Sequence, residues 1–278
     1  MVDDPAALPF RGAVPYYVRG RLPYPASLAG TLAAALGLDG HGRLLDAGCG
    51  PGIVALRLAH LFDGVVGVDI DSDMLAEARR QADEQHVANA RWIESRAEDL
   101  PRDLGPFRVA TFGRSFHWMD HERLIPKVHE LLEPGGAFVI LFETGDAGSD
   151  SEASLPHPAP PGAAVEALIQ RYIPRGERAA GHERRADMLR NVGPMLTRAG
   201  FAGPEHVRAA GGEPLVRNSD DVVAFYFSHS HSAPPLFGDR AAEFEAELRR
   251  LLSDASPSGL FSVRGRDALL SIWRKPGA

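Results

Sequence analysis

The chain has 278 residues, 44% of them hydrophobic, which suits one large α/β domain with an inserted or appended subdomain and is too little for two full domains. Its formal net charge of −7 argues against a large nucleic-acid footprint, and no apolar run is long enough to span a bilayer. The single cysteine, Cys49, excludes an intrachain disulfide and a cysteine-based zinc site. The acidic start MVDDPAALPF lacks the basic and apolar regions of a signal peptide, so we expect a cytoplasmic protein without a membrane partner. We expect the protein to be either a monomer or a homodimer.

The first half of the chain alternates strand and helix patterns. Residues 14–37 predict an irregular arm followed by one helix. Ser72 is the expected N-cap of a later helix, with Met74, Leu75 and Ala78 on its inner face. Strand, helix and strand in repetition indicate parallel pairing with right-handed crossovers, which is a doubly wound sheet. The expected strands are 43–48, 64–70, 90–95, 107–113 and 137–143, and the expected helices are 52–62, 72–86 and the first part of 121–136.

The pattern changes after Glu143. TGDAGSDSEASLPHPAPPG is rich in proline, serine, glycine and alanine, which is typical of a linker or lid strap. Helices are expected at 163–173, 184–200, 220–232 and 240–255, with strands around 201–210 and 266–276. We therefore divide the chain into segments 1–42, 43–143 and 144–278.

The stretch LLDAGCGPG is a glycine-rich loop between a strand and a helix. A triphosphate-binding loop needs a lysine after its last glycine, but Ile53 follows Gly52. The dinucleotide pattern G-x-G-x-x-G fits Gly48 and Gly50, but its third position falls on Ile53. The spacing is instead Gly48-x-Gly50-x-Gly52.

Two carboxylates indicate what such a loop holds. Asp46 is aimed at the loop, where it would repel a pyrophosphate but suit an ammonium group, and Pro51 removes one N–H that an anion site would use. Asp69 closes the next strand, where a carboxylate can accept hydrogen bonds from both ribose hydroxyls of an adenosine. A ligand with an ammonium at one end and a ribose in the middle is S-adenosylmethionine.

Four motifs in order, LLDAGCGPG, GVDIDSDML, RAEDLP and LLEPGGAFVI, resemble the class I S-adenosylmethionine-dependent methyltransferases over residues 43–142. The resemblance implies a Rossmann-like, doubly wound α/β fold with a seven-stranded sheet, its last strand antiparallel, and a helical cap or lid insertion. It makes 1–42 an arm and helix that close over the cofactor, 43–143 the cofactor-binding core, and 144–278 a helical cap plus the remaining core strands.

The resemblance also assigns cofactor contacts by position. The loop glycines would let the backbone approach the methionine moiety, while Asp46 would orient its ammonium directly or through water. Asp69 would take the ribose hydroxyls. Relatives often carry an aspartate at the position of Arg96, so Glu98 is the candidate substitute for that contact with the adenine amino group. The remaining positions are Ile70 and Met74 packing on adenine, the Ala97 backbone N–H reaching a ring nitrogen, and Ser115 at the end of the fourth strand.

The substrate side resembles small-molecule enzymes related to trans-aconitate methyltransferase. The resemblance rests on SFHWMD, on the arm YYVRGRLPYP and loosely on FSHSHSAPPLFGDR. In that branch the arm closes over the cofactor, which assigns Tyr17 and Arg21 to it. The fourth strand is not followed by the Asn/Asp-Pro-Pro-aromatic sequence of nucleic-acid amino methyltransferases, which argues against DNA methylation.

His117 follows the fourth strand, where methyl donor and acceptor should meet. It is either a general base that accepts a proton from the acceptor or a residue that shapes the pocket. Met74 is either core or a cofactor contact.

Other polar residues have structural interpretations. Cys49 is interpreted as a small apolar filler, and Asp120 as a helix N-cap with Glu122 in the first turn. His229 and His231 are interpreted as polar cap positions on a helix, where they would point apart, so no metal site is expected.

The expected function is methyl transfer to a small molecule, at oxygen or a carboxylate, in small-molecule biosynthesis, with S-adenosylhomocysteine as product. The sulfonium methyl is already activated, so alignment in a water-excluding site supplies most of the acceleration. Three alternatives stay open: a non-methylating role that retains the cofactor (a cyclase or scaffold), a nicotinamide oxidoreductase, and a partner-binding module.

Overall fold

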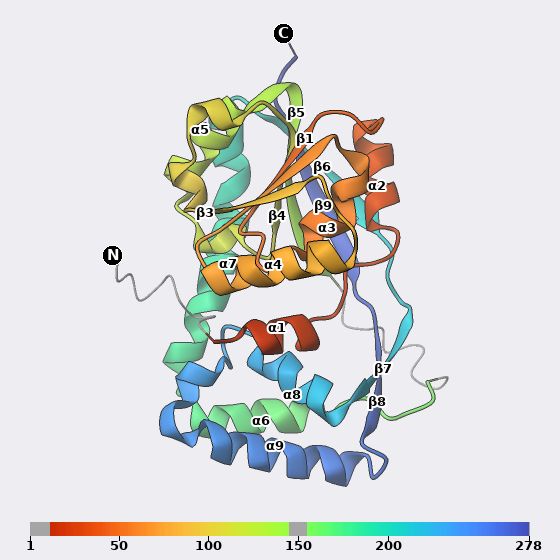
Figure 1. Ribbon diagram of the computed structural model, residues 1–278. Helices are drawn as coiled ribbons and strands as arrows, with labels where there is room; N and C mark the ends of the chain where they lie inside the picture. The colour runs from red at the N-terminus through yellow and green to blue at the C-terminus, as the bar shows by residue number, and fades with distance from the viewer. Residues whose placement is uncertain (1–11, 145–154, 278) are drawn as a thin grey trace. The chain divides into compact units, whose positions relative to one another are not determined.

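The computed structural model describes residues 12–144 and 155–277, with the backbone alone for 175–185 (Figure 1). Its elements group into two units, one of Met1–Pro23, Gly145–Glu183 and Gly211–Arg266, the other of Tyr24–Thr144, Arg184–Ala210 and Asp267–Ala278. The expected three-segment division does not coincide with these units, because the first helix groups with residues after 155. The acidic start of the chain and residues 145–154 of the expected strap lie outside the described residues.

The second unit contains one seven-stranded sheet in the order β3-β2-β1-β4-β5-β9-β6. Strands β1 to β5 pair in parallel, whereas β9 runs antiparallel to both β5 and β6. This confirms the predicted doubly wound sheet with its last strand antiparallel. The strands are β1 (Arg43–Ala47), β2 (Gly64–Asp69), β3 (Ala90–Glu94), β4 (Phe107–Gly113), β5 (Leu132–Thr144), β6 (Ala202–Ala209) and β9 (Asp267–Arg274).

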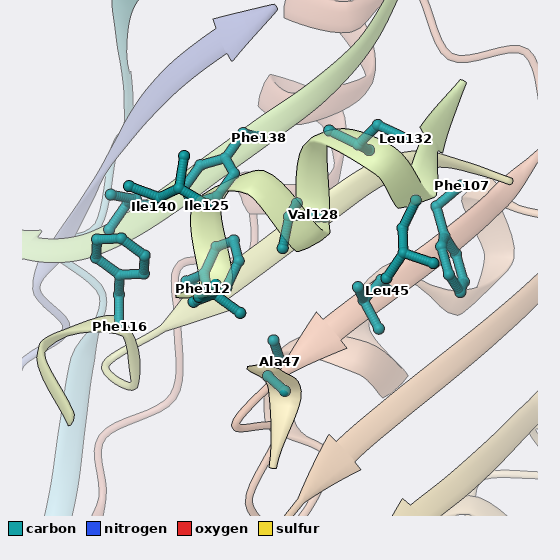
Figure 2. Close-up of a cluster of buried hydrophobic side chains, with 14 of the residues drawn as sticks. Leu45, Ala47, Phe107, Phe112, Phe116, Ile125, Val128, Leu132, Phe138 and Ile140 are labelled. Atoms are coloured by element: carbon teal, nitrogen blue, oxygen red, sulfur yellow. The ribbon is translucent and has the colours of Figure 1, made fainter. Parts of the chain in front are cut away.

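Helices cover both faces of this sheet, because its central strands are apolar on both sides (Figure 1). One face packs on α5 (His121–Leu131) and on the 184–198 part of α7 (Arg175–Arg198), and the other packs on α2 (Leu28–Leu36) and α3 (Ile53–Leu58). Figure 2 shows Ile125 and Val128 of α5 among aromatic side chains of the sheet such as Phe112 and Phe138, whose rings stack at 4.4 Å.

Helix α4 (Ser72–Glu84) begins one residue differently from the prediction. Asp71, not Ser72, is its N-cap: its backbone is extended, and its carboxylate accepts hydrogen bonds from the N–H groups of Asp73 and Met74. Met74, Leu75 and Ala78 are buried, as expected. Strand β5 begins earlier than expected, because Leu132 already pairs with Phe107 before a register shift. Short 3₁₀ turns η2 (Ala59–Leu61), η3 (Ala97–Asp99), η4 (Arg102–Leu104) and η5 (Phe116–Trp118) complete this unit.

The first unit is mainly helical around its own apolar cluster, which includes Leu168, Phe227 and Phe244. A two-stranded antiparallel sheet of β7 and β8 was not predicted, since β7 is a short segment in which exposed and partly buried residues alternate. Helix α8 ends at Phe227, earlier than expected. The elements are α1 (Val14–Gly20), α6 (Gly162–Tyr172), the start of α7, β7 (Pro214–Asn218), α8 (Ser219–Phe227), η7 (Pro234–Arg240), α9 (Ala241–Ala255) and β8 (Leu260–Arg264).

Helix α1 replaces part of the expected irregular arm and packs directly on α8. A Cβ atom on Gly20 would lie 2.2 Å from the carbonyl carbon of Ala224, so only glycine allows this approach. Arg19 donates hydrogen bonds to Asp221 at 2.8 Å and to Asn218 at 3.2 Å, both at the start of α8. The N-terminal helix is therefore held by contacts within this unit.

Among the described residues, no helix is both long and apolar enough to cross a membrane.

Candidate cofactor site

The candidate site lies where β1, β2 and β4 end, which is the edge at which open parallel sheets bind ligands. The sheet order places β1 between β2 and β4, so the chain reverses direction across the sheet at this point. All predicted site residues except Tyr17 and Arg21 belong to this unit: Asp46, Gly48, Gly50, Gly52, Asp69, Ile70, Met74, Ala97, Glu98, Ser115 and His117.

Asp46 is a buried structural carboxylate with two hydrogen-bond donors. Its side chain accepts from the Thr111 hydroxyl at 2.8 Å and from the Ala55 N–H at 3.1 Å. The residue is 1% exposed, and burial raises the pKa of its carboxyl to about 7, although both donors oppose that shift. Asp46 therefore ties β1, β4 and α3 together, and its charge depends on pH near neutrality.

Asp69 anchors the glycine loop from the end of β2. Its two carboxylate oxygens accept one N–H each, from Gly50 at 2.8 Å and from Asp71 at 3.0 Å. Burial raises the pKa of the Asp69 carboxyl above its ordinary value. A carboxylate has about four lone-pair positions, so both oxygens retain the capacity to accept further hydrogen bonds.

The backbone N–H groups of the loop are all used internally. Gly48 and Cys49 donate to the Val68 carbonyl, Gly50 donates to Asp69, and Gly52 donates to the Cys49 carbonyl. Pro51 has no N–H to offer. A phosphate-binding loop presents several N–H groups to its ligand, and this loop presents none. Its geometry is therefore unsuited to a pyrophosphate or triphosphate.

The glycines of this loop differ in what surrounds them. Gly48 and Gly50 have φ angles of +66° and +52°, which favour glycine. A Cβ on Gly48 would lie 2.4 Å from the Cβ of Ser115, whereas one on Gly50 would meet nothing within 4 Å. Gly52 is the N-cap of α3 and faces Trp92. Only the Gly50 position is open for a ligand to approach the backbone.

This difference predicts unequal effects of alanine. Gly50→Ala should cost about 1–2 kcal/mol, because it adds only left-handed backbone strain. Gly48→Ala should cost about 1–3 kcal/mol more, because it also forces Ser115 away. Chemical denaturation of both variants measures the difference, and equal losses of unfolding free energy would contradict the packing described.

The expected adenine side combines buried and exposed apolar residues. Met74 and Ala97 are buried, but Ile70, directly after Asp69, is 41% exposed. An exposed isoleucine beside the ribose-binding candidate offers an apolar surface that a planar base would cover. Glu98 is buried, and its carboxylate accepts from the Asp120 N–H at 2.8 Å, so it also joins η3 to the start of α5. Its adenine contact stays a prediction.

The end of β4 carries the third part of the site. The Ser115 hydroxyl donates to the Ala47 carbonyl at 2.6 Å and so joins this turn to the end of β1. His117 lies in η5, with its ring 5.1 Å from that of Trp118. Asp120 caps α5 by accepting from the Arg123 N–H, as predicted. Burial raises the pKa of the Cys49 thiol well above its ordinary value, which fits the apolar-filler interpretation.

Tyr17 and Arg21 belong to the other unit, so their contact with a cofactor stays a prediction. Arg21 donates to the Ser228 carbonyl at 2.7 Å and lies 3.3 Å from the His229 ring. His229 and His231 follow α8 instead of lying on it, and their rings lie 5.3 Å apart, so the expectation that they point apart on a helix is wrong. The described residues contain no cluster of three or more metal-ligating side chains.

Sequence reasoning missed two parts of this site. Thr111 is the partner of Asp46 because the parallel register of β1 and β4 sets them side by side. Arg114, directly after β4, forms an ion pair with Glu143 near the end of β5. The opposite charges at the ends of two adjacent predicted strands were a signal for this pair.

The site fits S-adenosylmethionine in three respects. The glycine loop directs no N–H group at a phosphate, the Asp69 carboxylate can accept further hydrogen bonds such as those of ribose hydroxyls, and Ile70 is exposed. Residues 44–136 match the family model described as a methyltransferase domain. Over these residues the chain carries a methyltransferase domain similar to those of the class I S-adenosylmethionine-dependent methyltransferases. Its methyltransferase domain thus covers the loop, both carboxylates and the end of β4.

Known methyltransferases resemble the chain over part of its length. An uncharacterised methyltransferase of Mycobacterium tuberculosis (strain H37Rv) is 34% identical over 140 residues, covering 50% of this chain and 54% of that protein. Trans-aconitate 2-methyltransferase of Variovorax paradoxus is 35% identical over 113 residues, covering 39% and 41%. The chain therefore spans about half or less of these relatives. The fold is shared with a type II methyltransferase structure from Anaeromyxobacter dehalogenans at a TM-score of 0.56, with 19% identity and 92% and 97% coverage.

Proposed function

We propose that this chain transfers the methyl group of S-adenosylmethionine to a small-molecule acceptor, at oxygen or a carboxylate. The observation that carries the proposal is that the backbone N–H groups of the glycine loop already donate to acceptors within the chain. Each N–H between Gly48 and Gly52 already has an acceptor, so the loop suits the amino-acid end of a ligand and not a phosphate. The Variovorax relative, named for trans-aconitate, supports a small acidic acceptor.

Most of the chain's own residues would bind and align the cofactor and the acceptor rather than take part in the reaction. When bound, the cofactor supplies an activated sulfonium methyl. Asp69 would accept the ribose hydroxyls, and the open backbone at Gly50 would allow close approach of the methionine moiety. Asp46 would supply negative charge behind the loop. His117, after β4, would take a proton from a hydroxyl acceptor or shape the pocket around it.

Ligand binding tests the cofactor directly. We expect S-adenosylhomocysteine at about a hundred times its Kd to raise the Tm by roughly 5–10 °C, whereas NAD should produce a smaller shift. A larger Tm shift with NAD than with S-adenosylhomocysteine would contradict the methyltransferase proposal and favour a nicotinamide oxidoreductase.

Asp69→Asn tests the ribose contact. Asparagine can accept only one of the two N–H bonds now made to Asp69 and has no charge, so affinity for S-adenosylhomocysteine should fall by about tenfold or more. Asp71→Asn is the matched control, because asparagine caps α4 equally well and Asp71 is partly exposed. Calorimetry on both variants measures the change, and equal affinities would contradict the assignment.

A second assay separates methyl transfer from a retained cofactor. Radiolabelled S-adenosylmethionine should label acceptors in a panel of small carboxylic acids and phenols. Tight cofactor binding without transfer to any acceptor would instead favour the alternative role that retains the cofactor, and turnover of a substrate without methylation would identify that role as a cyclase.

A further inference from the structure

Arg114 has an unusual backbone conformation at the edge of the site. Among the residues that the structure describes, His86 and Arg114 are the non-glycine residues with positive φ, +55° and +58°. His86 follows the C-terminal end of α4, where a left-handed residue commonly ends a helix. Arg114 instead lies between β4 and η5, where no helix ends. Such strain in a bulky residue persists only where its surroundings impose it.

The arginine side chain supplies that constraint. Its guanidinium donates to the Glu143 carboxylate near the end of β5, and its Cζ lies 4.7 Å from the centre of the Tyr24 ring. The Arg114 and Glu143 side chains are only 13% and 18% exposed. Tyr24 is itself fixed, because Arg57 donates to its carbonyl at 2.7 Å. The guanidinium therefore has both a charge partner and an aromatic surface on rigid elements.

The turn that Arg114 begins reaches the glycine loop. Ser115, the next residue, bonds to the Ala47 carbonyl and occupies the space that a Cβ on Gly48 would need. The turn then closes on itself, because the N–H of Trp118 donates to the Ser115 carbonyl at 3.0 Å and that of Met119 to Phe116 at 3.1 Å. His117 lies within this same turn.

We infer that Arg114 is a positioning residue: its ion pair with Glu143, stacked on Tyr24, holds the Ser115–Met119 turn against the glycine loop. The inference rests on the proposed function, because the position of this turn matters for activity only if the methyl donor and the methyl acceptor meet after β4. The left-handed backbone sets the direction in which the turn leaves β4. Without the ion pair, the turn would lose the side-chain anchor that ties its first residue to β5 and to Tyr24, and the turn would move.

The experiment replaces the side chain without disturbing the backbone. Arg114→Asn removes the guanidinium, while asparagine tolerates a positive φ, so any loosening comes from the lost ion pair. Hydrogen exchange at the Trp118 and Met119 amides should become about tenfold faster. Affinity for S-adenosylhomocysteine should fall by about fivefold, since Ser115 and Gly48 would lose their fixed contact.

Two further variants make the result decisive. Glu143→Gln keeps the shape of the acceptor but removes its charge, so it should shift both measurements in the same direction, and it carries the test alone if Arg114→Asn does not fold. His86→Asn, at the other left-handed position, should change neither. Unchanged exchange at Trp118 and Met119 in the folded ion-pair variants would overturn the inference. If the native chain fails to bind S-adenosylhomocysteine, the proposed function fails, but faster exchange would still support the positioning role.

Discussion

Affinity for S-adenosylhomocysteine should rise by about tenfold between pH 5.5 and 8 in the native chain and stay flat in Asp46→Asn. The pKa of the buried Asp46 carboxyl is raised to about 7, so this residue changes from mostly neutral to mostly charged over that interval. The ammonium group of the ligand favours the charged carboxylate. Binding should therefore strengthen as the carboxyl loses its proton and level off above neutral pH.

The same ionisation should affect stability with the opposite sign. Asp46 binds a proton more tightly in the folded chain than in the unfolded chain, where its pKa is near the ordinary 3.8. The free energy of unfolding should therefore fall as pH rises from about 4 to about 7, by at most about 4 kcal/mol from this residue. The difference between native chain and Asp46→Asn, measured by urea unfolding at each pH, isolates the contribution because other groups cancel.

The Asp46→Asn variant is the informative one because asparagine can satisfy the hydrogen-bonding groups that surround this position. Its carbonyl can accept from the Ala55 N–H while its amide donates to Thr111, whose hydroxyl can turn toward the Leu45 carbonyl at 3.4 Å. Asp46→Ala leaves the Ala55 N–H and Thr111 hydroxyl without their partner and should destabilise the chain by about 2–4 kcal/mol at any pH. A pH-dependent affinity that survives in Asp46→Asn would show that another group controls binding.

Gly20→Ala should detach helix α1 from α8. The new Cβ would lie within 2.3 Å of the Ala224 carbonyl and the Phe225 nitrogen, and backbone atoms cannot move aside as a flexible side chain can. We expect a loss of about 3 kcal/mol in unfolding free energy. The hydrogen bonds from Arg19 to Asp221 and Asn218 should open with the helix. Hydrogen exchange across residues 14–20 measures the detachment.

Gly30→Ala is the matched control for this prediction. Gly30 is an exposed position in α2, where a Cβ would meet nothing within 4 Å, so alanine should stabilise the chain by about 0.5–1 kcal/mol. If Tyr17 and Arg21 contact the cofactor, Gly20→Ala should also weaken binding of S-adenosylhomocysteine. Native protection of residues 14–20 in Gly20→Ala would show that the packing of α1 on α8 is adaptable.

The sheet and the loop were predictable because their signals are local. Apolar runs such as Leu44–Leu45 and Val65–Val66 indicate buried strands, and carboxylates at strand ends indicate a ligand edge. The partners of those carboxylates were not predictable, because Thr111 lies 65 residues from Asp46 and only strand register joins them. Helix α1 is similarly non-local: seven residues make a marginal helix, which here is stabilised by α8. The φ of Arg114 depends on Glu143 and Tyr24, which no sequence window contains together.

The position of β9 inside the sheet makes the pairing of β6 depend on the segment that follows Arg266. Among the described strands, β6 hydrogen-bonds only to β9, which lies between β5 and β6 although it follows both of them in the sequence. A nascent chain that has emerged only as far as Arg266 has both β6 and one edge of β5 unpaired. Unpaired strand edges pair readily with other chains, so β6 and this edge of β5 are open to aggregation until β9 inserts between them.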